Sequence, residues 1–172
     1  MRYYDYLIVG GGIIGLTIAR ELKRRYPERT IAILEKEEDV AKHSSGRNSG
    51  VLHAGFYYSA DSLKARFTKE GNQAMTRYCE DNGLKINKCG KIVVATNEEE
   101  LQGLYELKKR ADRNGVELHW ITESELRRID SNVRTFKRAL YSPTTSTVDP
   151  VEVCAKLKEE ITSSGVEIFF NC

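Results

Sequence analysis

An apolar run that leads into a glycine-rich hexapeptide constrains this chain more than any other feature. Residues 6–9 read Tyr-Leu-Ile-Val, and Gly10-Gly11-Gly12-Ile13-Ile14-Gly15 follows directly. The spacing Gly-x-Gly-x-x-Gly is typical of the strand, tight turn and helix start of a dinucleotide-binding unit. Gly10 allows the sharp turn, Gly12 lets the backbone approach a pyrophosphate, and Gly15 lets helix and strand pack closely. The anion would then lie on free N–H groups at the start of the helix.

The residues that follow complete this pattern. Pro27 ends the predicted helix, residues 30–34 form an apolar run that predicts a buried parallel strand, and Glu35 lies 20 residues after Gly15. An acid at this position accepts hydrogen bonds from both hydroxyls of an adenosine ribose. Taken alone, the glycines would fit an ordinary turn, and Glu35 would fit a solvated strand end. The complete succession of strand, glycine turn, helix, strand and acid instead predicts a site for an ADP-containing cofactor. Apolar residues recur at helical spacing between the two strands, at Ile14, Ile18 and Leu22.

The composition of the chain argues against several other classes of protein. The chain has 172 residues, a net charge of +2, and basic and acidic residues interleaved along the predicted helices, which argues against a nucleic-acid binder. We see neither a secretory signal nor an apolar run that could span a bilayer, and therefore expect a cytoplasmic protein, at most peripheral to the inner membrane. Metal binding and a disulfide framework are not indicated, because the cysteines show no ligand spacing. They are Cys79, Cys89, Cys154 and Cys172.

A polar segment and a histidine follow Glu35. Residues 43–50 read His-Ser-Ser-Gly-Arg-Asn-Ser-Gly, a loop whose hydroxyls, amide and guanidinium suit phosphate and ring polar atoms, although an ordinary surface loop has the same composition. His53 lies in the apolar segment that comes next. A lone histidine is usually a satisfied, partly buried residue, but its place directly after the polar loop favours a site residue.

The rest of the chain predicts alternating helices and strands. Residues 62–82 predict a helix that Ser62 caps, and Thr122 with Glu125 predicts a capping box. Residues 144–149 read as a loop, and Asp149-Pro150 as the start of a last helix before a final strand at 166–170. Further strands are expected at 89–95, 116–121 and 139–141, and a further helix from Asn97 to Gly115. The helix at 62–82 should pack through one face, formed by Leu63, Phe67, Ala74, Met75 and Tyr78.

The sequence resembles the D-amino-acid-oxidase-like superfamily of FAD oxidoreductases, and within it the L-2-hydroxyglutarate dehydrogenase (oxidase) family. The similarity covers the whole chain. Asn48-Ser49-Gly50-Val51-Leu52-His53-Ala54-Gly55-Phe56-Tyr57-Tyr58 with Ser62-Leu63-Lys64-Ala65 carries it most specifically, and the glycine segment, Leu34-Glu35-Lys36 and Cys89-Gly90-Lys91 add to it.

The resemblance implies oxidation of L-2-hydroxyglutarate to 2-oxoglutarate by FAD, with electrons passing to oxygen or a quinone. His53 is the candidate base or substrate contact. An amine or amino-acid oxidase, glycine- or sarcosine-oxidase-like, is the nearest alternative, and a non-catalytic nucleotide-binding subunit or fragment is another. The candidate cofactor-binding residues are Gly10, Gly12, Ile13, Ile14, Gly15, Glu35, Lys36, Ser44, Ser45, Arg47, Asn48 and Ser49.

The implied fold is α/β, a Rossmann-like FAD-binding domain with part of an α+β substrate domain inserted into it. We expect residues 1–84 and 149–172 to belong to the FAD-binding domain and residues 85–148 to the substrate domain. Because members of the family are much longer, we expect a truncated chain or one that works with a C-terminal half or partner subunit. Weak FAD retention and little turnover are therefore expected of this polypeptide alone.

Overall fold

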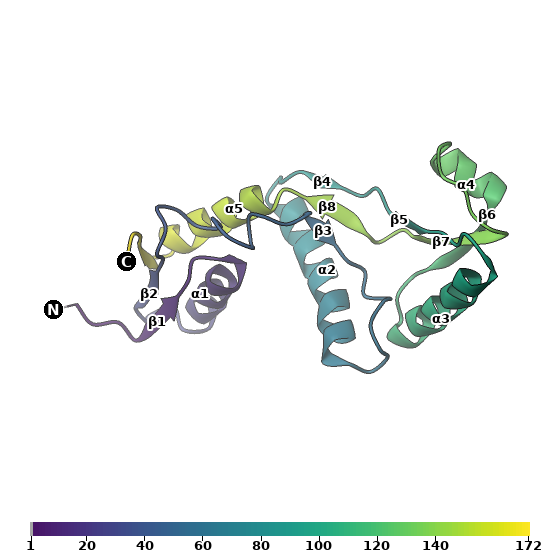
Figure 1. Cartoon of the computed structure of the whole chain (residues 1–172). Coiled ribbons are helices and arrows are strands. Elements are labelled where there is room, and N and C mark those ends of the chain that lie inside the picture. Colours follow the sequence, from purple (N-terminus) through teal and green to yellow (C-terminus); the bar gives the residue numbers. More distant parts are fainter. Residues whose placement is uncertain (1) are drawn as a thin grey trace. The chain divides into compact units, whose positions relative to one another are not determined.

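A computed structural model describes residues 2–172. The chain folds into two compact units, whose elements are labelled in Figure 1. Of the described residues, the first unit contains 2–50 together with Asp149–Cys172, and the second contains Val51–Val148. Residues 51–84, which we assigned to the FAD-binding domain, thus pack with 85–148. Compactness does not identify the segments that bind a cofactor, so the functional boundaries stay a prediction.

The first unit is built on the predicted parallel sheet. Strand β2 (Ile31–Leu34) lies between β1 (Tyr6–Val9) and β9 (Glu167–Phe169), and it is parallel to both. Helix α1 (Ile13–Arg25) connects β1 to β2, helix α5 (Pro150–Ser163) leads into β9, and the two helices pack against each other. The sheet and the two helices share a buried apolar core. It includes Leu16, Ala19, Ile31, Ile33, Val153, Leu157 and Ile161.

Helix α1 uses a different face from its most regular apolar stripe. It buries Gly15, Leu16 and Ala19, whereas Ile14 and Ile18 are exposed. Small residues bring the helix close to the sheet, so these positions, and not the largest side chains, set the packing face.

The second unit contains two antiparallel sheets. In one, β8 (Ser146–Val148) lies between β3 (Val51–Leu52) and β4 (Ile86–Asn87). In the other, β7 (Arg138–Ser142) lies between β5 (Lys91–Val93) and β6 (His119–Thr122).

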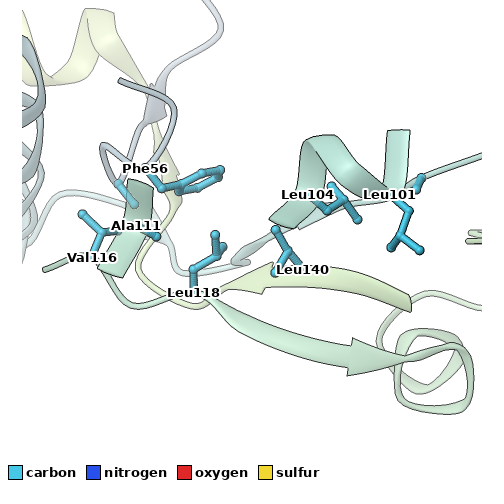
Figure 2. Packing of buried hydrophobic residues seen from close by; sticks show 9 residues of the cluster. Phe56, Leu101, Leu104, Ala111, Val116, Leu118 and Leu140 are labelled. Carbon is cyan, nitrogen blue, oxygen red and sulfur yellow. The ribbon is translucent and has the colours of Figure 1, made fainter. Parts of the chain in front are cut away.

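Three helices complete this unit, α2 (Leu63–Asp81), α3 (Glu98–Asn114) and α4 (Glu123–Ile129). Figure 2 shows Leu101 and Leu104 of α3 above β7, which carries Leu140. Phe56, which is 1% exposed, belongs to the same core cluster.

The N-terminal caps of four helices were predicted correctly from the sequence. The side chains of Ser62 and Asn97 accept backbone hydrogen bonds at the starts of α2 and α3, and Asp149 does so for α5. Thr122 and Glu125 form the predicted capping box of α4. Cap signals are local, so their chemistry is readable from a few consecutive residues.

Two expectations about the second unit were wrong. The predicted loop at 144–149 contains β8, because its backbone pairs with strands distant in sequence. The predicted face of α2 is also incorrect, since Leu63 and Phe67 are 66% and 58% exposed while Ala65, Asn72 and Cys79 are buried. In residues 2–172, no helix has the length and apolar character needed to cross a membrane.

Candidate cofactor and substrate sites

The glycine segment has the geometry that its sequence predicts. Gly10 adopts φ +106°, a conformation that side chains disfavour, and its N–H donates to the carbonyl of Leu34. A Cβ on Gly15 would lie 2.0 Å from the Gly10 carbonyl oxygen. The absence of a side chain at Gly15 is therefore what allows α1 to approach β1 so closely.

Glu35 joins the end of β2 to this segment. Its carboxylate is buried, with Oε2 accepting a 2.6 Å hydrogen bond from the N–H of Gly11 and Oε1 accepting one of 2.9 Å from the N–H of Glu37. A carboxylate that accepts two backbone hydrogen bonds is fixed in direction and keeps further lone pairs for a ligand. It therefore presents a preoriented acceptor at the rim of the glycine turn.

Ser45 from the polar loop lies at the N-terminus of α1. Its hydroxyl oxygen accepts a 3.0 Å hydrogen bond from the N–H of Ile13, and a Cβ on Gly12 would lie 2.9 Å from that oxygen. Gly12, the N-cap residue of α1, has no side chain to perform this capping. The loop thus places a hydroxyl at the positive end of the helix, where an anion is stabilised.

A cavity of about 400 Å³ opens between the glycine segment, the end of β2 and the polar loop. Its volume lies within the range typical of small-molecule sites. Of the predicted cofactor-binding residues, those that line it are Gly10, Gly12, Glu35, Lys36, Ser44 and Ser45. These glycines, the buried acid and the hydroxyls fit the ribose and diphosphate of an adenine dinucleotide.

The other predicted cofactor residues do not line this cavity. The N–H of Ile13 donates to the Ser45 hydroxyl, Ile14 is exposed, and Gly15 packs against the carbonyl of Gly10. Asn48 shapes the loop, because its side chain donates to the carbonyls of Ser44 and Ser45 and accepts from the N–H of Gly50. Arg47 and Ser49 are exposed.

The sequence did not identify several further lining residues, namely Val9, Leu34, Ala41, Lys42, His43 and Cys172. Ala41 has φ +59°, and its N–H donates to the carbonyl of Gly11. The N–H of Cys172 donates to the carbonyl of Glu35. No local sequence pattern predicts these two hydrogen bonds, because each joins backbone groups that are far apart in the sequence.

His53 belongs to the second unit and follows β3 directly. The residue is exposed, but its ring is partly buried, and this burial lowers the pKa of His53 below the usual 6.5. The positive charge of Lys91 lowers the pKa further. A neutral imidazole therefore predominates near pH 7, as a proton acceptor requires.

Two curated relatives of this sequence are named L-2-hydroxyglutarate dehydrogenase. L-2-hydroxyglutarate dehydrogenase of Escherichia coli strain UMN026 is 42% identical over 168 residues, which are 98% of this chain and 40% of that protein. The mitochondrial L-2-hydroxyglutarate dehydrogenase of Dictyostelium discoideum is 43% identical over 177 residues, again with 98% and 40% coverage. The chain thus spans about 40% of the length of these relatives.

Two solved structures with the same fold are oxidases. L-alpha-glycerophosphate oxidase from Mycoplasma pneumoniae, described with FAD bound, superposes with a TM-score of 0.91 at 27% identity, over 99% of this chain and 45% of that one. Glycine oxidase from Geobacillus kaustophilus gives 0.84 at 27% identity, over 98% and 46%. The family described as FAD dependent oxidoreductase (DAO) matches residues 5–172, and the chain belongs to this family.

Proposed function

We propose that the first unit binds the ADP half of FAD. The observation that supports this proposal most directly is the buried Glu35 carboxylate, which is hydrogen-bonded to Gly11 and lines the cavity beside Gly10 and Gly12. In this arrangement Glu35 accepts from the ribose hydroxyls. Gly12 leaves space for the Ser45 hydroxyl, and this hydroxyl together with the N-terminus of α1 stabilises the charge of the diphosphate.

We further propose that the complete enzyme oxidises L-2-hydroxyglutarate to 2-oxoglutarate. The support is the shared name of the curated relatives, of which this chain spans about 40%. When bound, FAD would supply the acceptor for the hydride of the hydroxyl-bearing carbon. His53 takes the hydroxyl proton, and the lowered pKa of its imidazole suits this role. We further predict oxygen or a quinone as the electron acceptor, and a cytoplasmic location that is at most peripheral to the inner membrane.

Anaerobic flavin reduction tests this function. The purified protein is reconstituted with FAD, together with any polypeptide that copurifies with it, and mixed with L-2-hydroxyglutarate, glycine or sarcosine. We expect flavin absorbance to bleach with L-2-hydroxyglutarate alone. Bleaching only with an amino acid would instead support the amine-oxidase alternative, which the similarity to glycine oxidase favours.

A non-catalytic nucleotide-binding role makes a different prediction in the same experiment. A protein that stays colourless after reconstitution, with and without its copurifying polypeptide, would support that role and contradict FAD binding. A yellow protein that no substrate bleaches, even with the copurifying polypeptide present, would keep the cofactor proposal and contradict the proposed reaction.

A further inference from the structure

The turn between β7 and β8 holds two functional segments in place. The buried side chain of Asn72 donates to the carbonyls of Leu52 and Thr144, at 2.9 and 3.0 Å. The N–H of Gly90 donates to the carbonyl of Thr145, at 2.9 Å. Leu52 directly precedes His53, and Gly90 directly precedes Lys91. Consecutive residues of one turn therefore anchor the segments that carry the imidazole and the ammonium group.

The ammonium group of Lys91 lies over an aromatic ring and makes a cation–π contact with it. Its Nζ lies 4.6 Å from the centroid of the Tyr57 ring, and the Tyr57 ring lies 4.3 Å, centroid to centroid, from Phe56. Phe56 is in the core and is almost completely buried. A cation over an aromatic face is attracted to it, and the packing of Phe56 fixes where that face lies. The position of the Lys91 charge is thus defined by the core.

This charge has no carboxylate partner within the part of the chain that the structure describes. None of the ion pairs found among residues 2–172 includes Lys91, whereas Lys88 on the same segment pairs with Glu80. Lys91 is half-buried, and its charge acts on His53 strongly enough to lower the pKa of that group. A partly desolvated cation without an acid beside it is a favourable place for an anionic ligand.

We propose that Lys91 binds a carboxylate of a 2-hydroxy dicarboxylate and thereby positions the substrate beside His53. This inference rests on the proposed function. The ring of Tyr57 contacts one side of the ammonium group, and the ammonium donors directed away from the ring are available to the carboxylate oxygens. The same contact favours acidic substrates over neutral ones, so Lys91 contributes to specificity as well as to affinity.

Lys91→Met is the informative variant, because it removes the charge and keeps an unbranched stem. Lys64→Met is the matched control, since Lys64 makes the same kind of contact, with Nζ 4.5 Å from the centroid of the Tyr58 ring, on the exposed side of α2. In the FAD-loaded protein we expect Lys91→Met to raise the KM for L-2-hydroxyglutarate about 10- to 100-fold, with kcat changed much less. Lys64→Met should leave KM within about twofold of the parent value.

Binding of glutarate separates a failure of this inference from a failure of the proposed reaction. Glutarate is a dicarboxylate without the reacting hydroxyl, and its binding is followed by NMR through the imidazole signals of His53. We expect it to shift these signals in the parent protein and in Lys64→Met, and not in Lys91→Met. In the absence of glutarate, Lys91→Met should raise the pKa of His53, because the repelling charge is gone.

Equal glutarate affinity in the parent and in Lys91→Met would overturn the inference, as would an absence of glutarate binding to the parent. Glutarate binding that depends on Lys91, in a protein whose flavin is not reduced by L-2-hydroxyglutarate, would support the inference and contradict only the reaction.

Discussion

The carboxylate of Glu35 accepts a 2.6 Å hydrogen bond from the backbone N–H of Gly11, 24 residues earlier in the chain. This bond joins the end of β2 to the turn that follows β1. A Cβ on Gly11 would lie 3.0 Å from Oε2 of Glu35, so a side chain there would crowd the carboxylate. The acid is consequently held in one orientation before any ligand binds, which lowers the entropic cost of binding.

Glu35→Gln should weaken FAD binding about 10- to 100-fold. The amide nitrogen of glutamine cannot accept a hydrogen bond, so one of the two backbone donors, Gly11 or Glu37, loses its partner. Flavin fluorescence titration measures the dissociation constant. Glu38→Gln is the control, because Glu38 is exposed and pairs with Lys42 at the surface. An unchanged dissociation constant for Glu35→Gln would show that the acid does not contact the cofactor.

Two glycine-to-alanine variants should change stability in opposite directions. Gly15→Ala places a methyl group 2.0 Å from the Gly10 carbonyl oxygen, and we expect a loss of about 1–3 kcal/mol or more in unfolding free energy. Gly71→Ala, inside α2, meets no atom within 4 Å and should gain about 0.5–1 kcal/mol from helix propensity. Urea denaturation measures both, and a stabilised Gly15→Ala would contradict the described packing.

The rate of flavin reduction should depend on the ionisation of His53. Because burial and the charge of Lys91 lower the pKa of His53 below 6.5, the basic form already predominates at pH 6.5. We expect the rate to rise with pH to a plateau whose midpoint lies below 6.5, and His53→Asn to lose about 100-fold or more. Stopped-flow measurements across pH give both values. A midpoint above 6.5, or an unchanged rate in His53→Asn, would argue against this imidazole as the base.

Asp5 should contribute stability that acid removes. The pKa of Asp5 is lowered to about 2, first by the backbone hydrogen bond from Thr30 and then by the bond from Arg29. A lowered native pKa stabilises the fold above the ordinary value of 3.8, and this contribution disappears as the pH falls towards 2. The parent should therefore exceed Asp5→Asn in stability at pH 5 and match it near pH 2 in urea titrations. A difference that stays constant over this range would be the contrary result.

The sequence predicted those features whose determinants are close together along the chain. The capping box of Thr122 and Glu125, the Asp149 cap and the Gly10 turn each depend on a few consecutive residues, and the structure contains all three. Predictions that depended on distant partners were less successful. The strand at Ser146–Val148 was taken for a loop because its pairing partners, β3 and β4, lie about 60–95 residues earlier in the chain.

The sequence alone determined the dinucleotide-binding motif of this protein. Its strand, turn, helix and acid follow one another within 35 residues, and each forms from residues that are close together in the chain. Only the tertiary structure decided which other residues meet there. Ala41 and Cys172 reach the cavity through backbone hydrogen bonds, and Asn72 and Gly90 anchor His53 and Lys91 to one turn. Such contacts are set by long-range pairing and by the need to satisfy buried polar groups, which no short stretch of sequence records.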